Sequence, residues 1–521
     1  MIAVVGSARA DRLTSASFHG RELAREIRTV QHRPNIVLIF SDQHRGDALG
    51  CVGNPVVRTP NLDGLAAEGV IFRNCNTNSP LCMPARASLI TGMYVNEHGA
   101  WGNRTEADRH GPSHVRNIRD AGYCTAVIGK THFRLYQADD GHTRDHASGL
   151  HDWGYEFAHE TKDTIPSATH RCYYTDFLAE RGKLQVYEDC ARNFRLGQST
   201  GFLRPWEHLP NLLEEGEHID AYIANTASEW IRSYADDRPF YLQVCLMGPH
   251  PPFDAPARYR DMFDPEEMPR AIMEPPAEPV SPQIRTMFSR RGLKDMTESQ
   301  SRTFTSHYYA KVAFDDHVIG VVLQALRDTG RMADTWIVYT SDHGEMLGDH
   351  RLAQKSVFYE GALNIPLIVR PPGGTESWTA PDLTDHYDIC ATLLDAAGAD
   401  PLEVDHGLSL RPKIEAGSDA SDAERGKDVV FSEVNLYSMA RTERYKMTID
   451  SLTRKPLELY DMADDPQELF NLVEEPGLSG VRDRFLGDYF DHLLAKVNET
   501  KLKVYQEGGI PTRLHQDYPE Y

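Results

Sequence analysis

The sequence predicts an α/β fold in which a large, mixed but mostly parallel sheet is sandwiched between helices. A smaller C-terminal α+β domain with an antiparallel sheet follows it. Continuous apolar, β-branched runs alternate along the 521 residues with segments of helical periodicity. The runs end in polar clusters. The sequence pattern changes after about Arg411, where a charged linker and then short predicted strands begin. With 40% hydrophobic residues, the chain can bury one large core with a smaller appendage.

Unbroken apolar runs are typical of parallel strands that are buried on both faces, and four of them predict the large sheet. Because ligands bind outside the carboxyl ends of such strands, we expect the polar segments that follow the runs to meet at one edge. The runs are Pro34–Phe40, Thr125–Ile128, Phe240–Leu246 and Trp336–Thr340, followed by Ser41–Gln43, Gly129–His132, Gly248–Pro252 and Ser341–Glu345.

Helical patterns lie between these runs and complete the layered architecture. They are predicted at residues 61–68, 87–91, 220–234 and 306–329. Residues 264–298 are rich in Pro, Met and charge, which predicts a long surface insertion near the site.

The C-terminal part reads as three short strands, at residues 429–432, 445–449 and 458–461, followed by a helix at about 480–497. The sequence therefore predicts four parts: a helical N-terminal extension (1–33), a catalytic domain (34–410), a C-terminal α+β subdomain (411–500) and a tail (501–521).

The charge balance restricts the partners. Lys and Arg number 55 against 77 Asp and Glu, a formal charge of −22, and no basic run is long enough to follow a phosphate backbone. Nucleic acid is therefore not an expected partner. An acidic exterior also repels polyanions, so we expect a small substrate held in a local pocket of positive charge and metal.

The eight cysteines are scattered without a C-x-x-C pair, which suits a reducing compartment. The only apolar run near the N-terminus, Ile2–Val5, is too short for a signal peptide, and no stretch approaches a membrane span. The expected location is the cytoplasm, without a membrane partner.

Cys82 opens a C-x-P-x-R pattern that ends at Arg86 and is followed by Ala-Ser-Leu-Ile-Thr-Gly. Taken alone, Cys82 could be a small buried hydrophobe. The pattern resembles the signature of type I sulfatases, and the stretch from Leu459 to Leu472 resembles their C-terminal signature. From about residue 34 to 471 the chain resembles the sulfatase and phosphonate monoester hydrolase branch of the alkaline phosphatase superfamily.

This resemblance implies an alkaline phosphatase-like sheet and an unusual nucleophile. In type I sulfatases a formylglycine-generating enzyme reads the pattern and oxidises the thiol, here that of Cys82, to the aldehyde Cα-formylglycine. Water adds to the aldehyde to give a diol. One hydroxyl can then attack the ester, and the other can later collapse the covalent intermediate and release the anion.

Asp42 and Gln43 follow the first predicted strand, and Asp342 and His343 follow the last. They offer a cation three oxygen donors and one imidazole, and the modified Cys82 would add an oxygen. Hard oxygen donors suit Ca²⁺, Mg²⁺ or Mn²⁺, and the imidazole shifts the preference toward Mn²⁺ or another transition ion. The resemblance implies one divalent cation, Ca²⁺ as in sulfatases or Mn²⁺ as in some phosphonate monoester hydrolases. Each pair taken alone could instead be a helix cap or turn.

Arg86, one helical turn beyond Cys82, has a fork of donors that suits a tetrahedral oxyanion. Lys130 and His132 lie two apart in an extended segment, so they are expected to project to the same side. One would neutralise the bound sulfate and the other would act as the base. Arg86 could alternatively form a surface salt bridge, and Lys130 and His132 could be solvated side chains at a strand end.

His250 lies between prolines that fix the backbone, and its ordinary pKa of about 6.5 suits a general acid for the leaving group. Lys355 matches, by resemblance, a sulfatase lysine that would stabilise the leaving oxygen or a sulfate oxygen. Asn103 is a candidate for hydrogen bonding the anion or a substrate group.

These residues predict a hydrolase of small organic sulfate monoesters of the arylsulfatase type. The Gly-Lys-x-His segment resembles sulfatases, whereas phosphonate monoester hydrolases tend to carry uncharged hydroxyl residues there. A phosphonate monoester or phosphodiester hydrolase is the alternative within the same fold. A silent metal- and anion-binding homologue with unmodified Cys82 is the alternative of another class. A Cys-His thiol hydrolase leaves the paired acidic motifs unexplained. Family resemblance also suggests a homo-oligomer.

Overall fold

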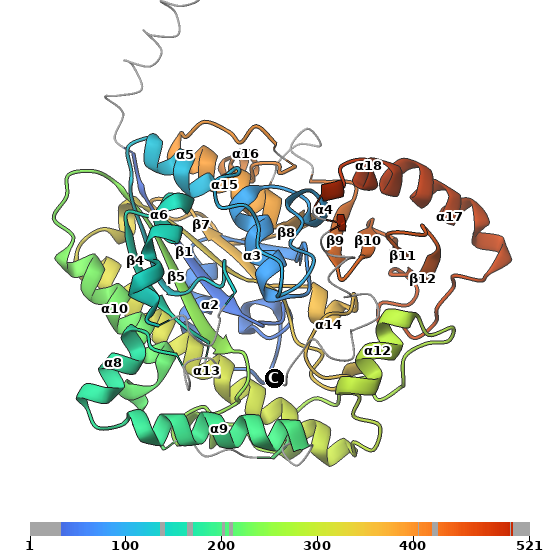
Figure 1. The fold of residues 1–521 in the computed structure, drawn as a ribbon, viewed down its shortest axis with the longest axis horizontal. Helices are drawn as coiled ribbons and strands as arrows, with labels where there is room; N and C mark the ends of the chain where they lie inside the picture. The colour runs from blue at the N-terminus through green and yellow to red at the C-terminus, as the bar shows by residue number, and fades with distance from the viewer. Residues whose placement is uncertain are drawn as a thin grey trace, which may run out of the picture.

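The computed structural model describes residues 33–503 except 136–140, 164–169, 201–203, 208–211, 405, 419–425 and 501. Apart from Arg33, Leu502 and Lys503, the predicted N-terminal extension and C-terminal tail lie outside the described residues. Figure 1 shows a large sheet between helices, with a smaller sheet beside it. None of the helices in the described part of the chain is both long and apolar enough to cross a membrane.

The large sheet has eight strands within the described residues, in the order β4-β3-β5-β1-β6-β7-β2-β8. Neighbouring strands are parallel except around β7, which runs antiparallel to β6 and β2. The predicted fold class is thus confirmed, and the four predicted strands lie side by side as β3, β5, β1 and β6. The strands are β1 (Asn35–Asp42), β2 (Val70–Asn76), β3 (Cys124–Lys130), β4 (Phe157–Thr161), β5 (Phe240–Pro249), β6 (Thr335–Ser341), β7 (Leu367–Arg370) and β8 (Trp378–Asp385).

The helices agree with the predicted patterns in position but differ at their ends. The predicted helix at 87–91 begins already at Cys82, and the one at 306–329 begins at Glu298, where Thr297 caps it. Residues 264–298 are not only a surface insertion, because they contain α12 and bury Met268 and Ile284. The helices are α2 (Pro60–Ala66), α3 (Cys82–Thr91), α4 (Val95–His98), α5 (His114–Asp120), α6 (Ala147–Trp153), α8 (Tyr173–Glu180), α9 (Leu184–Thr200), α10 (Ile219–Ser233), α11 (Ala257–Arg260), α12 (Pro282–Arg291), α13 (Glu298–Asp328), α14 (Glu360–Leu363), α15 (His386–Ala397) and α16 (Arg411–Ala416).

Strand β1 shows why helices cover both faces of the sheet. Its side chains alternate, so Val37 and Ile39 pack into the core that contains α2, α10 and α13. Ile36, Leu38 and Phe40 pack into the opposite core, with α3, α5 and α15. An unbroken apolar run therefore fills two cores at once, as predicted for a buried parallel strand.

The smaller sheet is antiparallel, in the order β12-β11-β10-β9. Its core includes Tyr94 and Tyr387, so the sheet packs directly against α15 and the segment before α4. The sequence analysis missed β10 and predicted one continuous helix where the chain forms α17, a π-helical turn and α18. These elements are β9 (Val430–Val434), β10 (Tyr437–Arg441), β11 (Tyr445–Asp450), β12 (Pro456–Asp461), α17 (Ser479–Arg484), the π turn (Phe485–Phe490) and α18 (Asp491–Leu494).

Candidate active site

Four strand ends meet at one edge of the large sheet. Strands β3, β5, β1 and β6 are adjacent and parallel, so their carboxyl ends lie together. Lys130 ends β3, Asp42 ends β1, His250 follows β5 and Asp342 follows β6. The strand order therefore gathers the polar segments that the sequence analysis placed at one edge.

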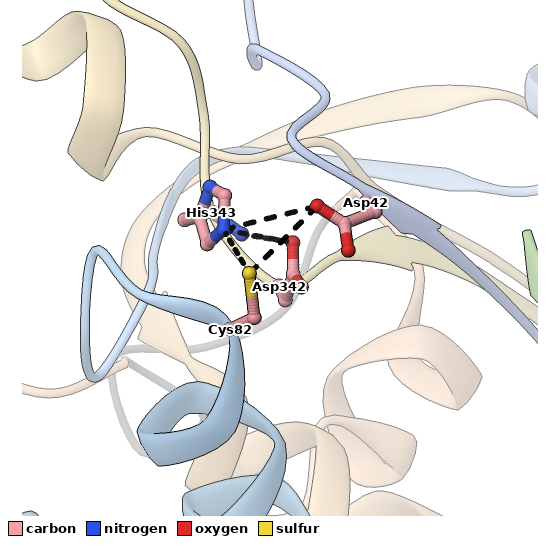
Figure 2. Close-up of side chains that lie close together, drawn as sticks. All are labelled: Asp42, Cys82, Asp342 and His343. Carbon is pink, nitrogen blue, oxygen red and sulfur yellow. Dashed lines mark hydrogen bonds and ion pairs between the residues drawn. The ribbon is translucent and has the colours of Figure 1, made fainter. Parts of the chain in front are cut away.

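Figure 2 shows Asp42, Cys82, Asp342 and His343 pointing toward one another; we call these four side chains the donor cluster. One ligand atom from each lies within 4.8 Å of the others, and all four side chains are buried. The Sγ atom of Cys82 is 3.2 Å from Nε2 of His343 and 4.0 Å from Oδ1 of Asp42. The cluster joins the ends of β1 and β6 to the first residue of α3.

The protonation states of the donor cluster suit a cation. Burial raises the pKa of Asp42, but Lys130 and the other nearby cations outweigh it, and the pKa lies well below its usual value. Burial also raises the pKa of Asp342, and its charged neighbours, Arg86 among them, hold it below the usual value. Burial lowers the pKa of His343 to about 3, so its imidazole is neutral. Two carboxylates and a neutral imidazole fit a divalent ion that accepts oxygen and nitrogen ligands.

Gln43 lies beside the donor cluster and is fixed on both sides. Its backbone adopts a left-handed φ of 71°, and its amide N–H donates to Oδ1 of Asp342 at 3.0 Å. Its side-chain Nε2 donates to Glu345, so its Oε1 faces Lys355 and accepts from Nζ at 2.6 Å. Nζ of Lys355 also lies 3.3 Å from Sγ of Cys82. The amide oxygen of Gln43 thus borders the space around Cys82.

Cys82 is the first residue of α3. Burial and the carboxylate of Asp42 raise the pKa of its thiol to about 11. The unmodified side chain is therefore protonated and a poor nucleophile. Asn103 lies against the same turn, where its Oδ1 accepts from the backbone N–H of Met83 at 3.0 Å. That contact fixes the start of α3, a function that the sequence analysis did not consider for Asn103.

Arg86 is buried and fully engaged by its neighbours. Its Nε and Nη2 donate to Oδ2 of Asp342 at 3.0 and 2.9 Å, and Nη2 also donates to Oδ2 of Asp42 at 3.1 Å. Its Nη1 donates to the carbonyl of Lys130 at 2.7 Å. The guanidinium fork therefore orients both carboxylates of the donor cluster.

Gly129 explains how β3 delivers its last residue to the site. Its φ is 109°, and a Cβ atom at this position would lie 1.9 Å from the carbonyl oxygen of Cys245 in β5. Only glycine permits so close an approach in this conformation. The Gly-Lys sequence thus places Lys130 against the neighbouring strand.

Lys130 lies between two carboxylates. Its Nζ is 2.6 Å from Oδ2 of Asp42 and 2.7 Å from Oδ2 of Asp163, and its side chain is fully buried. The extended segment predicted to carry His132 is interrupted, because His132 has a φ of 52°. Burial and then Lys130 lower the pKa of His132 to about 3, so the ring is neutral. It becomes an effective proton acceptor only when a bound anion raises this pKa.

His250 follows β5 and is neutral in the free site. Burial and then Lys355 lower its pKa to about 4. Its Nδ1 lies 2.7 Å from the carbonyl oxygen of Pro251 and must donate, because a carbonyl can only accept. Nε2 of the neutral ring is then an acceptor. A general acid at this position needs a proton on Nε2, which a bound anion would favour by raising the pKa.

The sequence analysis assigned no role to Asp163 or Glu345. Glu345 belongs to the polar segment that follows β6, so its position was a usable signal. Asp163 follows β4, whose exposed and buried residues do not form an unbroken apolar run. Register in the sheet still aligns the two strand ends, because Thr161 of β4 pairs with Lys130 of β3.

The parallel sheet, with buried carboxylates, imidazole and cations at its carboxyl edge, defines a hydrolase of the alkaline phosphatase superfamily. The sulfatase family profile matches residues 34–399, and a profile for the C-terminal region of N-sulphoglucosamine sulphohydrolase matches residues 348–489. The chain belongs to the sulfatase family. The predicted family and the predicted enzyme class, sulfuric ester hydrolase, are both confirmed at this level.

Three relatives illustrate the range of that similarity. The chain is 29% identical to an arylsulfatase of Clostridium perfringens over 94% of its own length and 98% of the relative's. It is 27% identical to the multifunctional alkaline phosphatase superfamily protein PehA of Trinickia caryophylli, over 93% of its own length and 100% of the relative's. Among solved structures, the phosphonate monoester hydrolase of Agrobacterium radiobacter superposes with a TM-score of 0.75 at 27% identity. The superposition covers 89% of this chain and 96% of the hydrolase.

Proposed function

We propose that this protein hydrolyses small organic sulfate monoesters of the arylsulfatase type. In this proposal a formylglycine-generating enzyme converts Cys82 to Cα-formylglycine, whose hydrate carries the nucleophilic hydroxyl. The observation that carries the proposal is the position of Cys82 in the donor cluster, within 3.3 Å of both His343 and Lys355. The raised pKa of the Cys82 thiol supports it as well, because a protonated thiol is a weak nucleophile.

We further propose that the donor cluster and Gln43 hold one divalent cation, Ca²⁺ in the first place and Mn²⁺ as the alternative. The donor set supports this, since it combines hard oxygen ligands with one imidazole. Such an ion polarises an ester oxygen and lowers the pKa of a hydroxyl next to it.

The remaining candidate residues receive roles consistent with their contacts. Arg86 holds the carboxylates of the donor cluster. Lys355, next to Cys82, neutralises a sulfate oxygen or the leaving oxygen, and Lys130 contributes charge from the side of Asp42. His132 is the base, and His250 donates a proton to the leaving group once the bound anion has raised its pKa. Asn103 supports these groups by fixing the start of α3.

Two measurements test the proposal on one preparation. Intact-mass spectrometry should show a loss of about 18 Da, the difference between a thiol and an aldehyde at the nucleophile. The converted protein should then hydrolyse an aryl sulfate with a higher kcat/KM than an aryl phosphonate. A fully converted protein with no sulfatase activity would exclude the proposal, and one that remains a thiol in its host would favour the silent binding homologue.

A phosphonate monoester or phosphodiester hydrolase is the second candidate. The similarity to the Agrobacterium phosphonate monoester hydrolase and to PehA favours it. Lys130 and His132 argue for sulfate, because uncharged hydroxyl residues tend to take their place in phosphonate monoester hydrolases. A higher kcat/KM for the aryl phosphonate would reverse the ranking.

We also propose the domain boundaries given above, 34–410 and 411–500, residence in the cytoplasm and assembly into a homo-oligomer. Limited proteolysis tests the boundaries, and light scattering of the purified protein tests the oligomer.

A further inference from the structure

The charge of Lys130 is shared between two buried carboxylates. Oδ2 of Asp163 lies 2.7 Å from Nζ of Lys130, which also pairs with Asp42, and Asp163 is itself buried. Burial raises the pKa of Asp163, but Lys130 and His250 together lower it by more, so the carboxyl is ionised. Lys130 therefore does not present a full unit of positive charge to an anion at Cys82.

Lys355 is in a different position. Its hydrogen-bond partners are Oε1 of Gln43 and Sγ of Cys82, and neither is a carboxylate. The carboxylates of Asp42 and Asp342 act on Lys355 only at longer range. The two lysines near Cys82 thus differ in how far their positive charge is compensated by carboxylates. Asp163 contributes to this difference, because it pairs with Lys130.

We propose that Asp163 is a specificity-determining residue, which sets the site to accept a singly charged ester by compensating Lys130. The inference rests on the proposed function at Cys82. A sulfate monoester carries one negative charge, whereas a phosphate monoester carries close to two at pH 8, because its second pKa is about 6. Each additional positive charge in the pocket favours the doubly charged ester over the singly charged one.

The test replaces the carboxylate without changing its shape. Asp163→Asn and the wild-type protein are compared with 4-nitrophenyl sulfate and 4-nitrophenyl phosphate at pH 8. The readout is the ratio of the two kcat/KM values. Since both esters have the same leaving group and share one preparation, the ratio does not depend on the fraction of converted Cys82.

We expect the phosphate-to-sulfate ratio of Asp163→Asn to rise about tenfold, as one unit charge held several ångströms from the anion would produce at an intermediate dielectric constant. Asp163→Glu keeps the charge and should keep the ratio near the wild-type value. Asp328→Asn is the matched control: it removes an exposed carboxylate at the end of α13, just before the chain enters β6 at the opposite edge of the sheet, and should leave the ratio unchanged. If Asp163→Asn does not fold, Asp163→Ser is also neutral and serves the same test.

An unchanged ratio in the folded neutral variants, with both rates lowered equally, would show that Asp163 is merely structural and would overturn the inference. Failure of the proposed function is a separate result: a converted wild-type protein that cleaves no sulfate. In that case calorimetry with methyl sulfate and inorganic phosphate at pH 8 gives the same comparison. A neutral variant that gains phosphate affinity relative to methyl sulfate supports the inference, and equal changes overturn it.

Discussion

The C-terminal sheet holds the segment that carries Lys355. Nζ of Lys446, on β11, donates to the carbonyl oxygen of Phe358 at 2.7 Å and lies 3.1 Å from Oε1 of Glu360. It also pairs with Glu468, whose Oε2 accepts from the backbone N–H of Glu360 at 2.8 Å. Phe358 is only three residues from Lys355, so replacing Lys446 should disturb the candidate active site from the smaller sheet.

We predict that Lys446→Met lowers the free energy of unfolding by about 3 kcal/mol, the lower end of the range for breaking a buried ion pair. The lower end applies for two reasons. Burial raises the pKa of Glu468 to about 7, so this carboxyl can take up a proton at neutral pH. Glu360 keeps its other partner, Arg441, at 2.7 Å.

Lys427→Met is the matched control. Lys427 also pairs with two carboxylates, Asp385 and Asp388, each at 2.8 Å, and burial raises the pKa of Asp388 to about 7. The control should therefore lose a similar free energy of unfolding, although it does not contact the segment that carries Lys355.

Urea unfolding and aryl sulfate kinetics separate the two effects. We expect Lys446→Met, at a temperature where it is folded, to lose about tenfold in kcat/KM, mostly in kcat, because a small displacement of a charged group near the reacting atoms has effects of this size. Lys427→Met should keep its kcat. If both variants lose the same stability and neither loses activity, Lys446 stabilises the fold without positioning Lys355.

Three further predictions concern the candidate site and the contact between the smaller sheet and α4. Arg86→Lys should lower kcat/KM for an aryl sulfate by at least about a hundredfold, because an ammonium cannot make the paired contacts of the fork; a tenfold loss or less would contradict this. Dialysis against a chelator should lower the melting temperature, and Ca²⁺ or Mn²⁺ at a hundred times its Kd should restore about 2.7 kcal/mol of stability; an unchanged melting temperature would argue against the metal site. Burial raises the pKa of Glu433 to about 7, above its unfolded value of 4.5, so its contribution to stability is present below pH 4.5 and is lost as the pH rises through 7. The free energy of unfolding of Glu433→Gln should therefore rise relative to that of the wild type by up to about 3 kcal/mol between pH 5 and 8, as measured by urea unfolding. A difference between the two proteins that stays constant over this pH range would refute the prediction.

Burial on both faces decides which strands could be predicted. β1, β5 and β6 are buried almost throughout and are unbroken apolar runs, so the sequence analysis found them. The edge strands β4 and β8 mix exposed and buried residues, and β7 has only four residues. The sequences of β4 and β8 carry no signal that separates them from loops, because an edge strand needs apolar residues only where it meets a core. β7 lies inside the sheet and is buried throughout, but so short an apolar run does not distinguish a strand from a buried helical segment.

The same distinction explains which site residues were found. Asp42 and Asp342 follow predicted strands, so the strand prediction was enough to place them at the carboxyl edge of the sheet. Asp163 follows β4, an edge strand that was not predicted, and was missed for that reason. Lys446 was missed because its contact with the carbonyl of Phe358 depends on how the smaller sheet packs against the loop before α14, which no local pattern expresses.

The sequence could not predict which carboxylates pair with which lysines, although this pairing determines how much positive charge a bound anion would encounter. Lys130 and Lys355 both received anion-binding roles from their positions in motifs. In the structure Lys130 lies between two carboxylates, whereas Lys355 donates to an amide oxygen and lies beside a thiol. Attraction between charges falls with distance and is screened least in a buried site, so the partner of each lysine fixes how much positive charge remains for an anion. Two lysines that look equivalent in the sequence are therefore not equivalent in the site. Lys355 interacts with the carboxylates of Asp42 and Asp342 only at longer range, so it retains more of its positive charge at Cys82 than Lys130 does.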